Sequence, residues 1–197
     1  MPDTQTKKKS TQHLQEHNKE ANQITRESLE TALLFLLEKK ELAKISISEL
    51  VEKAGVSRNA FYRNYQSKEQ MLEEMLDKVV RRMFKEVKAS AKKPNAPFSW
   101  LTLFQEAKKE ARLLRVAFQH NLEKKMSSMV SDFLSKPDKG TRSNEATETE
   151  SYLNSFWSSA IVSTLVKWVS DGMKISEEKM ANMDLPLFNR KKNNSTD

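Results

Sequence analysis

Cysteine is absent from this chain, and only three of its 197 residues are glycine. Without cysteine, disulfides, thiolate catalysis and cysteine-ligated metal sites are excluded. Gly55, Gly140 and Gly172 stand too far apart to build a loop that cradles phosphates or a dinucleotide. The longest apolar run, residues 32–37, is far shorter than the ~20 residues that cross a bilayer. The amino-terminal lysines precede no apolar core of a secretory signal, so we expect a cytoplasmic protein without a membrane partner.

Charge, by contrast, is abundant. Charged residues make up 31% of the chain, hydrophobic residues 37%, and the formal net charge is +7. The positive excess favours anionic partners such as nucleic acid. Few glycines and prolines, with many Glu, Lys, Leu and Ala, predict an all-α fold.

Hydrophobic periodicity divides the chain into four segments. Residues 1–22 are polar and lack a period, so we expect a disordered arm. Residues 23–67 contain three helical patterns, and residues 68–188 contain longer ones. Residues 135–150 are small and polar, as expected for a loop within the second domain. Residues 189–197 are predicted to be a polar tail.

Capping signals mark a helix-turn-helix in the first domain. Ser46 opens a capping box, and Gly55 ends that helix where a left-handed backbone is needed. Ser57 then caps a short helix, and Ser67 opens a long fourth one. Helix, tight turn and short helix form the unit that reads DNA in many regulators.

These residues resemble the TetR family helix-turn-helix. The resemblance rests on Gly55-Val56, Phe61-Tyr62 and Ser67-Lys68-Glu69, and it covers roughly residues 22–80. The later stretch "FWSSAIVSTLVKWVSDGMKISEEKMA" resembles the carboxy-terminal domain of one branch of this family, which includes a dihydroxyacetone-kinase operon activator. The resemblance implies an all-helical homodimer. Its three-helix amino-terminal domain would bind operator DNA, and its larger helical domain would bind a small molecule and dimerise.

The short helix also has the chemistry of a DNA-reading element. A helix capped at Ser57 turns Phe61 inward and leaves polar residues outside. We expect Arg58, Asn59 and the Ala60 methyl to meet base edges in the major groove, and the other residues to contact phosphates or to cap helices. The alternative is a polar surface helix with solvated arginines. The predicted DNA-binding residues are Ser46, Ser48, Ser57, Arg58, Asn59, Ala60, Tyr62, Arg63, Asn64 and Lys68.

The second domain offers two further sets of candidates. An effector pocket for an apolar or aromatic ligand would be built from Trp100, Phe104, Phe118, Met126, Met129, Phe133, Tyr152 and Phe156. The alternative is that these side chains are ordinary core. Small residues interleaved with large ones predict a close dimer interface formed by Trp157, Ala160, Ile161, Thr164, Leu165, Trp168, Met180 and Met183. The alternative is that the same residues pack inside a monomer.

Catalytic and metal-binding signatures are weak. His13 and His17 have the spacing of two metal ligands on a helix, but no third ligand stands near them in the sequence. No serine or histidine lies in a nucleophile signature. We therefore expect neither an enzyme nor a resident metal or cofactor.

Together these features predict a one-component transcriptional regulator associated with the nucleoid. We expect a ligand-released repressor that binds a palindromic double-stranded operator as a homodimer. One alternative is an activator or co-regulator on the same fold. The other is a ligand-independent, DNA-bound organiser of the nucleoid or of cell division.

Overall fold

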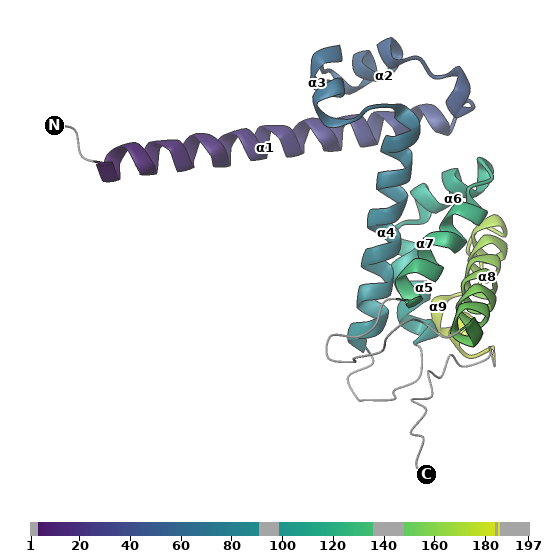
Figure 1. The fold of residues 1–197 in the computed structure, drawn as a ribbon. Helices are drawn as coiled ribbons and strands as arrows, with labels where there is room; N and C mark the ends of the chain where they lie inside the picture. The colour runs from purple at the N-terminus through teal and green to yellow at the C-terminus, as the bar shows by residue number, and fades with distance from the viewer. Residues whose placement is uncertain (1–3, 91–98, 136–147, 184, 186–197) are drawn as a thin grey trace. The chain divides into compact units, whose positions relative to one another are not determined.

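A computed structural model describes residues 4–90, 99–135, 148–183 and 185, except for the side chains of residues 4–15 and 17. All regular structure in these ranges is helical (Figure 1), which confirms the predicted all-α class. The first elements are α1 (Thr4–Leu37), the 3₁₀ helix η1 (Leu42–Lys44), α2 (Ile47–Ala54), α3 (Arg58–Asn64) and α4 (Lys68–Ser90). The later elements are α5 (Trp100–Lys109), α6 (Ala111–Gln119), α7 (Glu123–Ser135), α8 (Glu148–Ser170) and α9 (Glu177–Ala181).

The chain forms two compact units, Met1–Met75 and Leu76–Asp197, and the division falls within α4. The predicted boundary lies at residue 68, the start of α4. The first turns of α4 belong to the first unit because they are bonded to it: Arg26 of α1 donates to Glu74 at 2.7 Å. The predicted tail and most of the predicted loop, residues 136–147, lie outside the described residues.

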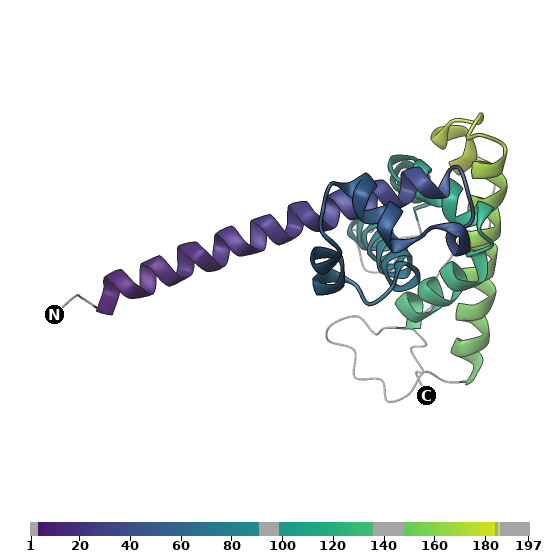
Figure 2. The same ribbon diagram turned by 90° about the horizontal axis from the view of Figure 1, so that it is seen from above.

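The long first helix corrects one expectation. Figures 1 and 2 show α1 as one continuous helix, and it begins at Thr4 rather than after residue 22. Residues 18–24 are exposed, so tertiary packing does not hold them in this conformation. Leu29 and Leu33, both fully buried, anchor the carboxy-terminal half, and adding residues to an existing helix is far easier than nucleating one. The Gln, Lys, Glu and Ala of this segment are good helix formers, which the absence of an apolar period concealed.

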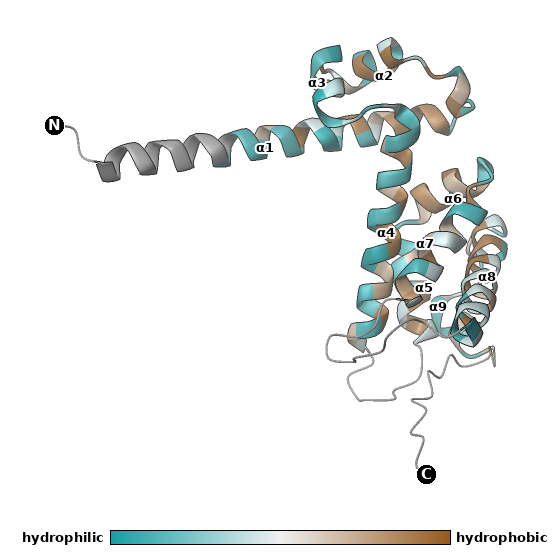
Figure 3. Ribbon diagram, in the orientation of Figure 1, coloured by the Kyte–Doolittle hydropathy of each residue, from teal (hydrophilic) through white to brown (hydrophobic). Residues whose placement is uncertain are grey.

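The first unit encloses a small apolar core beneath α2 and α3. In Figure 3 the apolar residues lie on α2 and on the carboxy-terminal part of α1, whereas α3 is largely polar. This contrast leaves α3 with a narrow inward face and a wide outward one. The core residues that are at most 2% exposed are Leu29, Leu33, Ile45, Leu50, Phe61, Tyr65, Met71 and Leu72.

The second unit has its own core, formed by the rest of α4 and by α5 to α8. Phe104 stacks beside Trp100 with ring centroids 5.8 Å apart and meets Trp168 edge-on at 5.1 Å. The indole nitrogen of Trp168 donates to the Ile175 carbonyl at 2.8 Å, which holds the turn between α8 and α9. The core residues that are at most 1% exposed are Leu76, Val80, Met83, Phe84, Leu103, Phe104, Ala107, Leu114, Val116, Ala117, Met126, Val130, Ile161 and Leu165.

Candidate nucleic-acid interface

The turn between α2 and α3 has the geometry that its capping residues predict. Ser46 caps α2, and its Oγ accepts a hydrogen bond from the Glu49 amide at 3.2 Å. Gly55 ends α2 with φ of 67°, the left-handed region in which a side chain is strained. Ser57 caps α3 through a bond from the Ala60 amide at 3.1 Å. The start of α3 is therefore held by local hydrogen bonds.

The inward face of α3 anchors the helix. Phe61 is fully buried, and its ring lies 6.1 Å from that of Tyr65, the residue that ends the helix. Ala60 is only 8% exposed. The predicted contact of Ala60 with a thymine methyl is therefore not supported. Successive residues of an α-helix are turned by ~100° from one another, so Ala60 falls on the buried side with Phe61 while its neighbour Asn59 stays exposed.

The outward face of α3 carries most of the predicted reading residues. Arg58, Asn59 and Arg63 are exposed, and Tyr62 is 59% exposed with its ring edge-on to Phe61 at 5.2 Å. The Arg58 guanidinium donates to the Ser48 hydroxyl on α2. Residues from both helices of the motif are thereby brought together on one exposed surface.

Two predicted phosphate contacts have other partners in the structure. The Lys68 ammonium donates to the carbonyls of Ile45 at 2.5 Å and Ala43 at 3.4 Å, and its side chain is 15% exposed. The Asn64 amide donates to the Ala60 carbonyl at 2.8 Å. Lys68 therefore fastens the start of α4 to the segment before α2, instead of presenting a free cation. Its sequence position near the recognition helix did not reveal these distant acceptors.

The predicted effector residues do not line a common cavity in the part of the chain described. Trp100, Phe104 and Met126 are buried in the core, whereas Tyr152 and Phe156 are 72% and 62% exposed. The half-buried members of the set are Phe118, Met129 and Phe133. Phe133 packs on Phe84 of α4 with centroids 5.5 Å apart. Three of these eight residues are therefore core, the alternative left open by the sequence, and the others differ widely in exposure.

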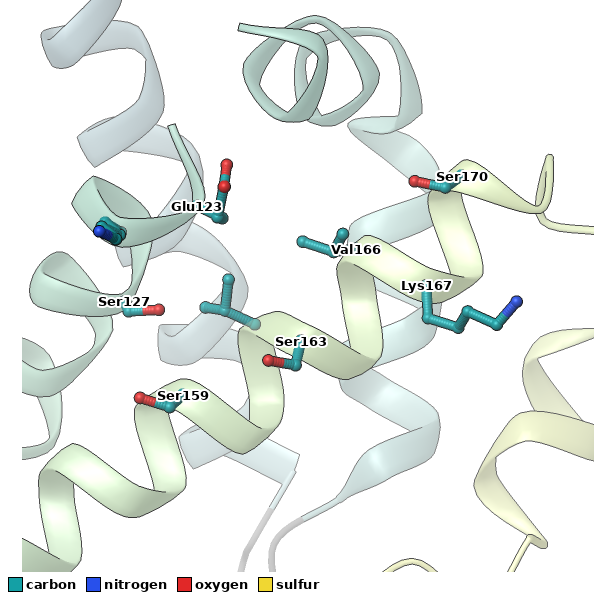
Figure 4. A pocket seen from close by; sticks show the side chains of 9 residues that line it. Glu123, Ser127, Ser159, Ser163, Val166, Lys167 and Ser170 are labelled. Atoms are coloured by element: carbon teal, nitrogen blue, oxygen red, sulfur yellow. The ribbon is translucent and has the colours of Figure 1, made fainter. Parts of the chain in front are cut away.

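A different hollow lies between α7 and α8. It is an open groove of about 540 Å³ (Figure 4). Figure 4 shows Ser159 and Ser163 of α8 directed toward α7, whereas Lys167 points away. Serine, valine and charged residues line this groove, and none of its lining residues is aromatic. The lining residues are Glu123, Lys124, Ser127, Ser159, Val162, Ser163, Val166, Lys167 and Ser170.

Comparison with known families decides the assignment of this fold. Residues 32–75 match the model described as bacterial regulatory proteins of the tetR family. Residues 99–189 match a transcriptional regulator C-terminal region of the same group. The chain belongs to the TetR family. Its helix-turn-helix is the DNA-binding motif of a family of transcription regulators.

Solved structures of TetR-family proteins have the same fold. The dihydroxyacetone kinase operon activator DhaS is 17% identical, with a TM-score of 0.52, covering 80% of this chain and 90% of that one. NalD from Pseudomonas aeruginosa, the secondary repressor of the MexAB-OprM multidrug efflux pump, is also 17% identical, with a TM-score of 0.57. That match covers 83% of this chain and 92% of NalD. No curated protein matches the sequence.

The predicted dimer residues of this TetR-family chain are largely used inside the protomer. Ile161 and Leu165 are fully buried, and Trp168 and Met180 are 2% and 7% exposed. Trp157, Ala160 and Thr164 are half-buried, and Met183 is 48% exposed. The predicted set mostly faces the core because α8 is apolar on more than one side, so the residue types alone did not distinguish its inner face from its outer one.

The outer face of α8 combines large and small side chains. Tyr152, Leu153 and Phe156 are 72%, 51% and 62% exposed near its start, and Ser159 and Ser163 are exposed further along. Large exposed aromatic groups on a helix are typical of an interaction surface. The aromatic residues that we assigned to a pocket, Tyr152 and Phe156, therefore belong to this face.

Neither a metal cluster nor a membrane span is found in the described part of the chain. The described His, Asp and Glu side chains form no group of three suited to a metal ion. The side chains of His13 and His17 lie outside the described part of the chain. None of its helices is both long and apolar enough to cross a bilayer.

Proposed function

We propose that this chain is a one-component transcriptional regulator that binds a palindromic operator as a homodimer and is released by a small ligand. The observation that carries this proposal is the exposed, capped α3, with Arg58, Asn59, Tyr62 and Arg63 on its outward face. A short helix with polar residues at its exposed start fits the major groove, which is ~12 Å wide.

The outward residues divide into reading and holding groups. Arg58 and Asn59 lie in the first turn of α3, where side chains reach base edges; arginine pairs with guanine and asparagine with adenine. Tyr62 and Arg63 lie later in the helix and suit phosphate oxygens, as do the hydroxyls near the start of α2. The bond from Arg58 to Ser48 holds the guanidinium at the surface and limits its conformations before DNA binds.

Dimerisation is assigned to the outer face of α8. Its residues Tyr152, Phe156, Ser159, Ser163 and Val166 recur at alternating spacings of four and three, the pattern of a helix pair in left-handed contact. In a two-fold antiparallel pair, the early residues of one helix meet the late residues of the other. With the two-fold axis between residues 159 and 160, Phe156 lies opposite Ser163 of the second copy, so an aromatic ring is placed against a small residue and the groove beside it.

Ligand control is assigned to the second unit. The helix α4 is continuous and belongs to both units, so a ligand that displaces it in the second unit also acts on the first. The two recognition helices must meet half-sites that are ~34 Å apart or a multiple of that distance. A small change in the separation of the two helices therefore weakens both contacts together. Whether binding represses or activates depends on the operator's position relative to the promoter.

The experiment that tests this function compares operator DNA with a scrambled duplex of the same length. The change Arg58→Ala is expected to weaken operator binding by about 1–3 kcal/mol and to affect scrambled DNA much less, because it removes a base contact. The matched control is Arg115→Ala, which removes an exposed arginine of α6. Equal loss on both duplexes would mean that Arg58 only holds phosphates, and no binding to any duplex from its own promoter region would refute the regulator function.

A further inference from the structure

A connected set of polar side chains lies behind the recognition helix, within the first unit. Tyr65, the residue that ends α3, donates its hydroxyl to Glu30 of α1 at 2.8 Å. The Arg26 guanidinium of α1 lies over the Tyr65 ring, with Cζ 4.5 Å from the centroid. The same guanidinium donates to the Glu74 carboxylate of α4 at 2.7 Å. Three helices thus meet through four side chains.

The connection continues into the turn between α3 and α4. The second carboxylate oxygen of Glu74 accepts a bond from the Gln70 side-chain amide at 3.0 Å. The Gln70 side-chain oxygen accepts a bond from the Gln66 backbone amide at 2.8 Å, and the Gln70 backbone amide donates to the Ser67 hydroxyl at 3.1 Å. The end of α3, the turn after it and the first two turns of α4 therefore share one hydrogen-bonded network.

Both donors of the network keep their protons. Burial, followed by the bond to Glu30, raises the pKa of the Tyr65 phenol, so it remains a neutral donor. Burial alone would lower the pKa of Arg26, but the hydrogen bond that Arg26 donates to Glu74 and the nearby acidic groups raise it overall, so it remains a cation.

The Tyr65 hydroxyl is not needed to fill the core. The residue is 2% exposed and its ring packs against Phe61 at 6.1 Å, which a phenylalanine ring would do equally well. Buried polar networks often contribute less to stability than to fixing one arrangement of the groups they join. Here the arrangement that is fixed is the direction of α3, whose other end is held by the Ser57 cap.

We propose that Arg26, Tyr65 and Glu74 are positioning residues for DNA reading, which set the angle of α3 against the first turns of α4. This inference rests on the proposed function, because it assigns the network an effect on how Arg58 and Asn59 meet base edges. A displacement of α4 that breaks the bond between Glu74 and Arg26 leaves the end of α3 joined to α1 through Tyr65 and Glu30, but no longer linked through Arg26 to the Glu74 carboxylate of α4. The network is thus the route by which a shift of α4 reaches the reading residues.

The test uses Tyr65→Phe and Glu74→Gln in the full chain, singly and together. Each single change is expected to lower the ratio of operator affinity to scrambled-duplex affinity by about 3- to 10-fold, the effect of one hydrogen bond of ordinary net strength. Affinity for scrambled DNA should stay unchanged, since no phosphate contact is lost. The double variant should lose less than the product of the two single effects, because both changes break one network.

The matched control is Glu86→Gln, at an exposed carboxylate later in α4. It should leave the ratio unchanged. A lowered melting temperature with an unchanged affinity ratio would show a purely structural network and overturn the proposal. Wild-type protein that binds both duplexes equally would refute the proposed function and this inference together, whereas a discriminating wild type with unaffected variants would refute the inference alone.

Discussion

At the scale of single residues, the exposed side chains of α3 differ from Lys68 in how far they are bonded to other parts of the protein. Arg63 and Asn59 are exposed on α3, and Arg58 has only the light restraint of the Ser48 hydroxyl. Lys68, one helix later, has two backbone carbonyls as partners and a largely covered side chain. Positive charge is therefore left exposed for the proposed DNA contact on α3, whereas at Lys68 it joins two segments of the first unit.

Replacing Lys68 with methionine tests this distinction. The aliphatic stem is kept and the ammonium is lost, so the carbonyls of Ala43 and Ile45 lose their donor. We expect a loss of ~1–3 kcal/mol in the free energy of unfolding, the cost of leaving such groups without a partner. Chemical denaturation measures it, with Lys85→Met, at an exposed lysine of the same helix, as the control. Unchanged stability together with a salt slope for DNA binding that is lower by about one unit would instead make Lys68 a phosphate contact.

At the scale of elements, the features that the sequence predicted are those that depend on residues close together in the chain. The caps at Ser46 and Ser57 and the stop at Gly55 involve partners within four residues, and all three were expected. The bond between Arg26 and Glu74 joins residues 48 positions apart, and no local pattern announces it. Short-range rules therefore locate the reading helix but not the network that orients it.

The eighth helix shows a second limit of sequence reasoning. Ile161 and Trp168 are buried in the protomer, while Tyr152 and Phe156 are exposed, although all four are large apolar or aromatic residues. When large apolar residues occur on more than one side of a helix, the sequence does not indicate which side packs against the core. The face of α8 proposed as the interface is therefore identified from the packing of the second unit, and it does not follow from hydrophobic periodicity.

Opposite charges test the proposed pairing of α8 with a second copy. Phe156→Glu and Ser163→Arg should each raise the dissociation constant of the dimer by about 100-fold or more, because each buries an uncompensated charge. The two changes in one chain should restore it, since the two positions face each other across the two-fold axis. Sedimentation equilibrium measures the association. The control is Ile24→Glu on α1, at a residue 64% exposed compared with 62% for Phe156; no rescue by the double change would contradict the register.

At the scale of the whole molecule, the unit that contains the helix-turn-helix and the second unit share one continuous helix, α4. The formal net charge of +7 adds a sequence-independent attraction to DNA, which salt weakens. Under the proposed function, specific binding exceeds this background because two recognition helices engage two half-sites at once. The family assignment and the exposed face of α3 support this arrangement, in which reading and dimerisation are inseparable.

The most direct measurement of the central claim is the stoichiometry and salt dependence of binding to a palindromic duplex from the chain's own promoter region. The account predicts two chains per palindrome, much weaker binding to a duplex with one half-site, and a log–log salt slope of about 0.9 for each phosphate neutralised. Light scattering gives the stoichiometry, and titrations at several salt concentrations give the slope. One chain per duplex, with equal affinity for one half-site and two, would contradict the account.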